Sequence, residues 1–364
     1  MKAGIVGLPN VGKSTLFNCL SNAKAQSANF PFCTIEPNVG VVNVPDPRLK
    51  KLEELVNPER VVPATVEIVD IAGLVKGASK GEGLGNQFLG NIRETDAIIH
   101  VLRCFENDNI VHVDGNVNPI RDKETIDIEL QLKDLETVDK KLEKVKKAAR
   151  TGNKDAMRED EVLSAVKSAL ESGKSVRTVQ VDETSRAEFI KPLQFITDKP
   201  VLYLCNVNDD AAVTGNAYVE QVRELVKDEN AEVLILAVGT EADITELESY
   251  EERKEFLADM GLDEPGSAKL IRSAYKLLNQ ETYFTAGVKE VRAWTINSGA
   301  TGPQAAGVIH TDFEKGFIRA EVIKYDTYVQ YGSEQKVKEA GKLKVEGKEY
   351  IVQDGDIMHF LFNV

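Results

Sequence analysis

Short apolar runs, each bounded by charged residues or turn formers, recur through the first three quarters of the chain. Residues 97–102, 201–205 and 233–237 are short, predominantly apolar runs, with His100 inside the first, which is typical of parallel strands that are buried on both faces. Ile5-Val6 and the alternating segment 65–69 complete the set of predicted strands. The pattern therefore predicts an α/β fold with a mostly parallel sheet.

The interval between the strands at 97–102 and 201–205 is far longer than one crossover helix requires. Within it, apolar residues recur at spacings of three, four and seven on either side of the turn Thr151-Gly152-Asn153. Such spacings place the apolar side chains on one stripe of each helix, so two helices can pack as an antiparallel hairpin. The residues of the two predicted stripes are Leu132, Leu135, Leu142 and Val145, then Leu163, Val166 and Leu170.

From about Leu278 the pattern changes to strand-like segments around one short helix. The predicted strands are 283–285, 291–296, 317–323 and 357–362, with a helix at 303–309 and a turn at 354–356. A small mixed sheet on a helix follows, and it lacks any catalytic constellation, so binding is its expected role. The predicted domains are a mostly parallel α/β domain at 1–128 and 198–277, an inserted hairpin at 129–197, and a C-terminal domain at 278–364.

Composition narrows the class of protein without identifying the chemistry. The 364 residues exceed the usual size of one hydrophobic core, and the net charge of −14 argues against a generally basic surface, although local RNA contacts remain compatible with it. Cys19, Cys33, Cys104 and Cys205 are scattered without metal-site or disulfide spacing. No apolar run is long enough to span a membrane and no signal peptide is recognisable, so the cytoplasm is the expected location.

The segment Gly7 to Thr15 carries the clearest chemical signal in the chain. It reads G-L-P-N-V-G-K-S-T, the G-x-x-x-x-G-K-S/T phosphate-binding loop between a strand and a helix. Backbone N–H groups of such a loop, together with the positive end of the helix, cradle a polyphosphate. Lys13 is predicted to reach the β and γ phosphates and Ser14 to hold Mg²⁺. The predicted loop contacts are Asn10, Val11, Gly12, Lys13, Ser14 and Thr15.

Two further elements would complete a nucleotide-dependent switch. Asp70-Ile71-Ala72-Gly73 follows the strand at 65–69 and matches D-x-x-G, in which the aspartate orients Mg²⁺ through water and the glycine N–H meets the γ-phosphate. Thr34 lies in the intervening loop and is predicted to complete the Mg²⁺ shell, a contact that orders such loops only with the third phosphate present. Ser14, Thr34 and Asp70 are therefore the predicted metal residues.

At this point the chain resembles a known family. The segments 7–15, 29–38 and 70–89, the last of them a long glycine-rich second switch, resemble the Obg-related P-loop proteins. The C-terminal segment resembles a TGS domain of the β-grasp type, and the hairpin is similar to that of the YchF (Obg-like ATPase) subfamily. The resemblance covers essentially the whole chain. It implies a translation-associated NTPase that hydrolyses ATP, binds ribosomes and has its nucleotide-binding domain split around the hairpin.

The choice of nucleobase stays open at this level. Guanine-specific relatives carry N-K-x-D after the corresponding strand, whereas here the segment is Asn206-Val207-Asn208-Asp209. Val207 can pack on a base but provides no cationic stem, and Asp209 occupies the discriminating position, where the subfamily typically has glutamate. Asn206, Val207 and Asp209 are the predicted base contacts. ATP is favoured on the resemblance, and GTP remains an alternative.

Several features bear on hydrolysis. Leu74 follows Gly73 where many switch GTPases place a water-orienting glutamine, so slow basal turnover that a partner stimulates is expected. Asn10 could help to hold a potassium ion beside the phosphates or only shape the turn. His112 could orient the water or be a packed, hydrogen-bonded histidine. His100, within an apolar strand, is expected to be structural. Lys13, Asp70, Gly73 and His112 are thus the catalytic candidates.

Basic residues crowd the predicted tip of the hairpin in an otherwise acidic chain. They are Lys140, Lys141, Lys144, Lys146, Lys147, Arg150, Lys154 and Arg158. A solvated helix face with i,i+4 partners and a contact to an RNA backbone are both compatible with this run. Three functions therefore remain: a ribosome-linked ATPase switch that uses Mg²⁺, a GTPase of ribosome assembly, and an RNA-binding adaptor in which the nucleotide is a structural ligand.

Overall fold

The computed structural model describes residues 1–22, 39–71, 85–113, 115–247 and 249–363. The chain forms two compact units, one comprising Met1–Gly40 and Glu67–Leu270 and the other Val41–Val66 and Ile271–Val364. In the described part of the chain, no helix combines the length and the apolar character needed to cross a bilayer.

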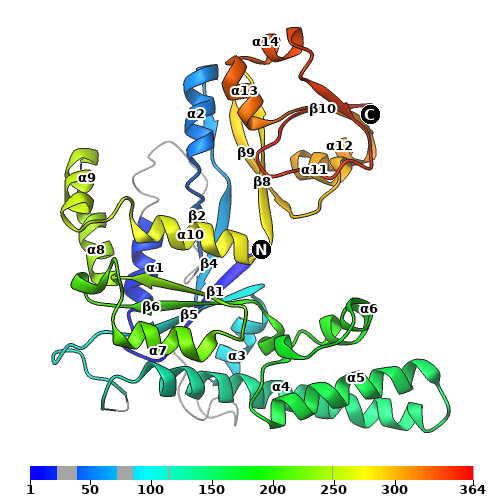
Figure 1. The fold of residues 1–364 in the computed structure, drawn as a ribbon. Helices are drawn as coiled ribbons and strands as arrows, with labels where there is room; N and C mark the ends of the chain where they lie inside the picture. The colour runs from blue at the N-terminus through cyan, green and yellow to red at the C-terminus, as the bar shows by residue number, and fades with distance from the viewer. Residues whose placement is uncertain (23–38, 72–84, 114, 248, 364) are drawn as a thin grey trace. The chain divides into compact units, whose positions relative to one another are not determined.

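A parallel sheet forms the centre of the first unit (Figure 1). Its strands follow one another in the order β2-β4-β1-β5-β6-β7, with β2 (Val39–Asn43) at the edge and parallel pairing from β4 to β7. Ile5 of β1 pairs with Asp70 on one side and Ile99 on the other. Every residue of β5 and of β6 is buried, as the short apolar runs predicted, and the buried set includes His100 and Arg103 of β5. The parallel strands are β1 (Lys2–Val6), β4 (Thr65–Asp70), β5 (Ala97–Arg103), β6 (Val201–Asn206) and β7 (Glu232–Leu236).

Helices cover both faces of this sheet. α4 and α7 lie along one face, where α4 contacts β5 and α7 contacts β7, while α1 packs on β1 and α8 (Figure 1). The helices of this unit are α1 (Lys13–Asn22), α3 (Gly85–Arg93), α4 (Pro119–Ala149), α5 (Lys154–Glu171), α6 (Glu183–Ser185), α7 (Ala217–Val226), α8 (Val238–Glu246) and α9 (Tyr250–Asp259). α10 (Gly266–Leu277) carries the chain across the boundary between the units.

The carboxyl ends of the parallel strands lie at one edge of the sheet. Ligands of open α/β sheets bind outside that edge, because the loops that leave the strands converge there. In this unit the edge brings together the segments 7–12, 104–110, 206–210 and 237–240 and the residue Asp70. The fold thereby assembles the candidate site from parts that are far apart in the sequence.

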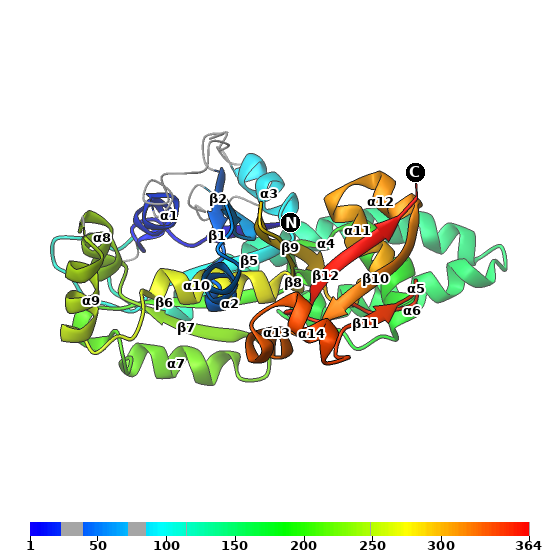
Figure 2. The ribbon, with the colours of Figure 1, turned by 90° about the horizontal axis from the view of Figure 1, so that it is seen from above.

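The inserted segment is an antiparallel helical hairpin, as predicted. α4 and α5 lie side by side in both views (Figures 1 and 2), and Asn153 caps α5 by accepting hydrogen bonds from Asp155 N and Ala156 N. Their shared core consists of Val138, Leu142, Val145, Leu163, Val166, Leu170, Val176, Ile190 and Phe195, with Leu135 partly buried beside it.

The assignment of Leu132 to the apolar stripe was wrong, since 40% of this side chain is exposed. In the part of α4 that precedes Val138, the first residue of this helix in the hairpin core, polar side chains are also buried. Asp134 is fully buried and accepts hydrogen bonds from Ile196 N (2.9 Å), Thr197 N (2.7 Å) and Thr197 Oγ1 (2.7 Å). Here α4 packs on a turn of the returning chain instead of on α5, and periodicity alone could not show that change of neighbour.

The second unit is a mixed sheet with a helix in its core. The strand order is β11-β10-β12-β8-β9-β3, and α11 contributes Ala305 and Ala306 to a core that includes Tyr283, Phe317 and Phe360. The predicted strands, the helix at 303–309 and the turn at Gly355, with φ of 87°, are all present. Its elements are β2 (Val39–Asn43, which begins in the first unit), α2 (Pro47–Val56), β3 (Val61–Val62), β8 (Gln280–Ala286), β9 (Val291–Asn297), α11 (Gly302–Ile309), α12 (Thr311–Lys315), β10 (Phe317–Ile323), α13 (Tyr325–Tyr331), α14 (Glu334–Glu339), β11 (Lys344–Glu346) and β12 (Ile357–Phe362).

The division of the chain differs from the prediction in two stretches, residues 41–66 and residues 271–277, both of which lie in the second unit. Both were assigned from sequence to the nucleotide-binding domain. For residues 41–66 the reason is long-range pairing: Val61 of β3 is in register with Val291 of β9, and Arg48 at the start of α2 forms an ion pair with Asp354 at 2.7 Å. Neither contact has a signature in the local sequence. The hairpin belongs to the first unit, and its independence as a domain stays a prediction.

Candidate nucleotide site

The loop between β1 and α1 has the backbone that a phosphate cradle requires. A Cβ on Gly7 would lie 2.6 Å from the carbonyl oxygen of Val101, so only glycine fits there. Asn10 and Gly12 adopt left-handed conformations, with φ of 64° and 99°. The first hydrogen bond of α1 then follows, from Leu16 N to Gly12 O at 2.9 Å. This chain path directs successive N–H groups toward one point at the positive end of α1.

Lys13 lies at the first position of that helix and is buried. Its Nζ donates a hydrogen bond to the carbonyl oxygen of Leu8 at 2.7 Å, so the ammonium group folds back over the loop. Burial lowers the pKa of Lys13 to about 8, and the nearby Asp70 carboxylate opposes this shift only in part. A polyanion above the loop would give this buried ammonium group a partner of opposite charge and would favour its charged form.

Ser14 and Asp70 come together at the predicted metal position. The Ser14 hydroxyl lies 3.4 Å from Oδ2 of Asp70, while the other oxygen, Oδ1, is buried and has no hydrogen-bond partner among the described residues. Burial raises the pKa of Asp70, and Lys13 and the Ser14 hydroxyl act against that shift. A hydroxyl and an orphaned carboxylate oxygen are hard ligands of the kind that Mg²⁺ takes from proteins, so the residues fit this ion. Thr34, Gly73 and Leu74 lie outside the described residues.

Asn206 joins the phosphate loop to the loop after β7. Its Nδ2 donates to Val11 O at 2.9 Å, and its Oδ1 accepts from Val238 N at 3.0 Å. The approach is so close that a Cβ on Gly12 would lie 2.5 Å from Asn206 Nδ2. The predicted base contact is thus a buried bridge that holds two loops in place, a role that no single motif reveals.

A cavity of about 670 Å³ opens between these loops. It is lined by Asn10, Gly12, Thr15, Phe105, Asn107, Ile110, Asn206, Val207, Asn208, Asp209, Asp210, Val238 and Gly239. Val207 is buried, whereas Asp209 is exposed and its Oδ1 accepts a hydrogen bond from the Thr240 hydroxyl. The volume falls within the range of sites for small molecules and cofactors. Candidate phosphate and base residues therefore share one cavity.

One wall of the cavity was not predicted. Arg103, at the end of β5, is 2% exposed, and its guanidinium donates to the carbonyl oxygens of Phe105, Asn107 and Ile110 at 3.1, 3.2 and 3.0 Å. The same group lies over the Phe105 ring, 4.6 Å from its centroid. An arginine that directly ends a buried strand is a sequence signal for such a shaped loop, because a buried guanidinium requires several acceptors.

The two histidines differ in their surroundings. His112 is buried, and its Nε2 lies 2.8 Å from Oδ2 of Asp122 in the first turn of α4; it does not line the cavity. Asn10 donates from Nδ2 to the carbonyl oxygen of Val111, the preceding residue, at 3.1 Å. His100 lies against the Tyr203 ring, and burial, aided by Lys123, lowers its pKa to about 3, consistent with a structural, neutral side chain.

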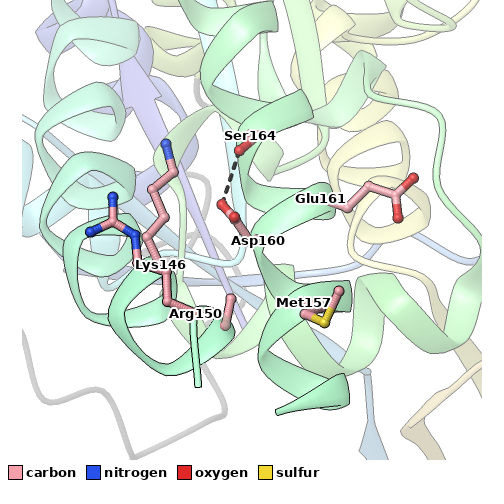
Figure 3. A pocket seen from close by; sticks show the side chains of 7 residues that line it. Lys146, Arg150, Met157, Asp160, Glu161 and Ser164 are labelled. Atoms are coloured by element: carbon pink, nitrogen blue, oxygen red, sulfur yellow. Dashed lines mark hydrogen bonds between the residues drawn. The ribbon is translucent and has the colours of Figure 1, made fainter. Parts of the chain in front are cut away.

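The hairpin tip is basic and largely unpaired. Lys141 pairs with Glu159 at 2.8 Å and Arg158 lies 3.8 Å from Glu188, but the other six basic residues make no ion pair in the part of the chain that the structure describes. A groove of about 450 Å³ lies between Lys146 of α4 and Arg150, which directly follows α4, on one side and Met157, Asp160 and Glu161 of α5 on the other (Figure 3). The solvated face weighed above therefore lacks most of its expected i,i+4 partners.

These features define a P-loop nucleoside triphosphatase. They are the glycine-containing loop before α1, the buried Lys13, the pair formed by the Ser14 hydroxyl and the Asp70 carboxylate, and the adjoining cavity. The family model YchF-GTPase_C, described as a protein of unknown function (DUF933), matches residues 280–363, and the model described as 50S ribosome-binding GTPase matches residues 2–154. The chain belongs to the YchF family.

Full-length relatives support this membership. The chain is 59% identical over 363 residues to "Ribosome-binding ATPase YchF" of Escherichia coli O157:H7, covering 100% of this chain and 99% of that protein. It is 54% identical over 366 residues to the Bacillus subtilis (strain 168) protein of the same name, covering all of both. The solved structure titled "Structure of the Schizosaccharomyces pombe YchF GTPase" is 39% identical, with a TM-score of 0.90, and the match covers 99% of this chain and 97% of that one. The two bacterial relatives are named as ATPases, whereas the Schizosaccharomyces pombe protein is named as a GTPase.

Proposed function

We propose that this protein is a ribosome-associated ATPase switch of the cytoplasm that binds ATP with Mg²⁺ and hydrolyses it slowly until a partner stimulates turnover. The observation that carries the proposal is the single cavity in which the phosphate loop faces the segment Asn206 to Asp210. The names of the bacterial relatives support both ATP and the ribosome. Because these relatives align with nearly the whole of this chain, we extend the activity in their names to this protein.

Four side chains carry out the chemistry in this proposal. Lys13 stabilises the charge of the β and γ phosphates, and Ser14 and Asp70, with Thr34, would hold Mg²⁺. When bound, this ion supplies positive charge to the phosphate oxygens during transfer. The main contribution of the chain is therefore positioning and electrostatic stabilisation, with Gly73 N–H as a further donor to the γ-phosphate.

The decisive experiment measures phosphate release from ATP and from GTP at saturating concentrations, with and without ribosomes. We expect low basal turnover of ATP and an increase of at least tenfold on adding ribosomes. Asp70→Asn should abolish the Mg²⁺-dependent part of the turnover, because the neutral amide no longer supplies the negative charge that orients Mg²⁺ through water. Tight ATP binding with negligible turnover even beside ribosomes would favour the RNA-binding adaptor instead.

ATP is proposed over GTP on the names of the bacterial relatives and on Val207. A valine gives the base an apolar surface without the cationic stem of the guanine-specific motif. Asp209 is the observation that keeps the GTPase of ribosome assembly as a second candidate, because a carboxylate can accept from guanine N1 and N2. Dissociation constants for both nucleotides on one preparation decide between them. A GTP constant at least tenfold lower than that for ATP would overturn the choice.

Ribosomal RNA is the proposed partner of the hairpin tip and of the TGS-like domain. At the tip, Lys144, Lys147 and Arg150 are exposed and, within the described residues, form no ion pair, so their charges are available to phosphates. Reversing these three charges should weaken ribosome binding and flatten its dependence on salt by about three counterions. Reversing Lys174, Lys254 and Lys276, which are exposed outside the tip and form no ion pair within the described residues, is the matched control. Unchanged binding of the tip variant at low salt would remove the contact from the proposal.

Two finer assignments belong to the same proposal. His112 is proposed to orient the attacking water, since Leu74 cannot, and His112→Ala should then lose the stimulated turnover. Asn10 is proposed to assist a potassium ion, so turnover should be faster in potassium than in sodium chloride. The bond from Asn10 Nδ2 to Val111 O leaves its side-chain oxygen as the atom that could face a cation. Equal turnover rates in the two salts would mean that Asn10 only shapes the turn of the phosphate loop.

A further inference from the structure

The segment that follows β5 is fixed by hydrogen bonds from three different parts of the first unit. Arg103 donates to Ile110 O at 3.0 Å, Asn10 of the phosphate loop donates to Val111 O at 3.1 Å, and His112 bonds to Asp122 of α4 at 2.8 Å. Three consecutive residues, 110–112, are thus hydrogen-bonded to strand β5, to the phosphate loop and to helix α4, respectively. The position of His112 depends on all three.

The pair formed by His112 and Asp122 is shielded from solvent. Their side chains are 3% and 2% exposed, and the second carboxylate oxygen of Asp122 accepts from the Arg121 guanidinium at 3.0 Å. Arg121 also donates to Asn116 Oδ1 and to Asn116 O, both at 2.7 Å, which fixes the turn before α4. A buried carboxylate paired with a guanidinium is ionised and acts as an acceptor, so the imidazole donates from Nε2. In the neutral ring Nδ1 is then the nitrogen that accepts a hydrogen bond.

Asp122 also belongs to the longest helix of the described chain. α4 has 31 residues, is capped by the Asn118 side chain through Arg121 N, and runs without interruption to the basic tip at Ala149. At 1.5 Å per residue, the distance along the helix from Asp122 to the tip is about 40 Å. A displacement of α4 therefore changes the position of Asp122 directly.

We propose that Asp122 is a positioning residue for His112, which fixes the Nε2–H tautomer and the orientation of the ring and connects both to the hairpin helix. This inference rests on the proposed function, in which His112 orients the water. It deepens that function by naming the contact through which a partner at the hairpin tip acts on turnover. The dyad resembles the arrangement in which a buried carboxylate orients a catalytic imidazole without reacting itself.

The test is Asp122→Asn, which keeps the shape of the side chain but offers an NH₂ donor to the ring and so favours the opposite tautomer. Ribosome-stimulated kcat should fall at least tenfold, while the KM and the dissociation constant for ATP stay within twofold, because Asp122 does not line the cavity. In the His112→Ala background the same change should have no further effect. Asp134→Asn is the matched control: this carboxylate is equally buried in α4 but bonds only to the turn at 196–197, so kcat should be retained.

The outcomes separate the inference from the proposed function. If His112→Ala lowers kcat and Asp122→Asn does not, or if Asp122→Asn causes a further loss in the His112→Ala background, the positioning role is overturned and the ATPase switch stands. If His112→Ala retains stimulated turnover, the water-orienting role and the positioning role both fall, while ATP binding stays as proposed. Absence of turnover in the wild type would remove the proposed function itself.

A measurement on the wild-type protein keeps the inference testable even if Asp122→Asn does not fold. The chain contains four histidines, so ¹⁵N-labelled side-chain spectra are simple to assign with the His112→Ala variant. At a pH where the ring is neutral, His112 should show a protonated Nε2 and an unprotonated Nδ1. A protonated Nδ1 would overturn the proposal.

Discussion

The two ends of the nucleotide site are constructed in different ways. The phosphate end is one continuous segment, from Gly7 to Ser14, completed by Asp70 from the neighbouring strand. The base end combines three loops, at 105–110, 206–210 and 238–239, which are separated from one another by long stretches of sequence. One end is therefore encoded mainly by local backbone geometry and the other by long-range packing. Mutations should distinguish the two ends.

A single buried side chain connects them. Asn206 uses its amide nitrogen for Val11 in the phosphate loop and its oxygen for Val238 in the base region. Because no other described side chain is bonded to both of these loops, the two ends are expected to respond together only when Asn206 is changed. Substitutions at either end should therefore affect phosphate binding and base binding to different extents.

The strongest test of the phosphate end is Lys13→Ala. Loss of a charge-assisted contact to the β and γ phosphates should raise the dissociation constant for ATP at least a hundredfold, which corresponds to about 3 kcal/mol. Calorimetry with ATP and with adenosine makes the comparison, since adenosine contacts the base end alone and its weak binding should be retained. Lys2→Ala, an exposed lysine of β1, is the control. Equal loss for ATP and adenosine would show that the ends are not separable.

Asn206→Ala should disturb both ends together. It leaves Val11 O and Val238 N buried without their partner, so we expect a loss of about 2–3 kcal/mol in the free energy of unfolding and about thirtyfold weaker ATP binding. Urea unfolding and calorimetry measure the two effects. Asn297 is exposed at the end of β9 and does not line the cavity, so Asn297→Ala should change neither quantity appreciably. A variant that loses base discrimination but keeps its stability would contradict the bridging role.

The phosphate end of the site could be predicted from the sequence, whereas much of the base end could not. Gly7, Lys13, Ser14 and Asp70 were predicted to lie at one site because each lies at a fixed offset from a strand, and the structure brings them together, while their roles stay predictions. The apolar runs likewise predicted the parallel sheet, because strands buried on both faces need no polar positions.

What could not be predicted depends on contacts between distant segments. Phe105 and Ile110 line the cavity because Arg103 fixes the carbonyl groups of their loop, and no pattern within that loop encodes this. Leu132 was misassigned because α4 exchanges one packing partner for another along its length. The grouping of residues 41–66 with the second unit arises from a two-residue strand, β3, that is too short to have a periodicity.

The pKa of Lys13 makes the phosphate end sensitive to pH. In the free protein this pKa is lowered to about 8, whereas a bound triphosphate favours the charged form, so ATP binding takes up a proton above pH 8. The dissociation constant should therefore rise about tenfold between pH 7 and pH 9. Because the folded state binds fewer protons at Lys13 than the unfolded state, the contribution of this group to the free energy of unfolding should increase between about pH 8 and pH 10.5.

Calorimetry of ATP binding at pH 9, in buffers of different ionisation enthalpy, measures the proton uptake directly. The wild type should take up nearly one proton for each ATP bound, and Lys13→Ala should take up none. Uptake that persists in Lys13→Ala would assign the proton to another group.

The smallest effect is expected at the base end, from Asp209→Asn. The Thr240 hydroxyl donates to Oδ1 of Asp209, and asparagine can preserve that bond, so the loop should keep its shape. Guanine presents two donors, N1–H and the N2 amino group, to a carboxylate at this position, whereas adenine presents only its N6 amino group. We therefore expect GTP to bind about fivefold more weakly and ATP to change by less than twofold, measured by competition on one preparation. Asp210→Asn, at the next exposed position of the same wall, is the control. An equal loss for both nucleotides would mean that Asp209 supports the loop without reading the base, and discrimination would then rest with Val207 and the backbone around Val238.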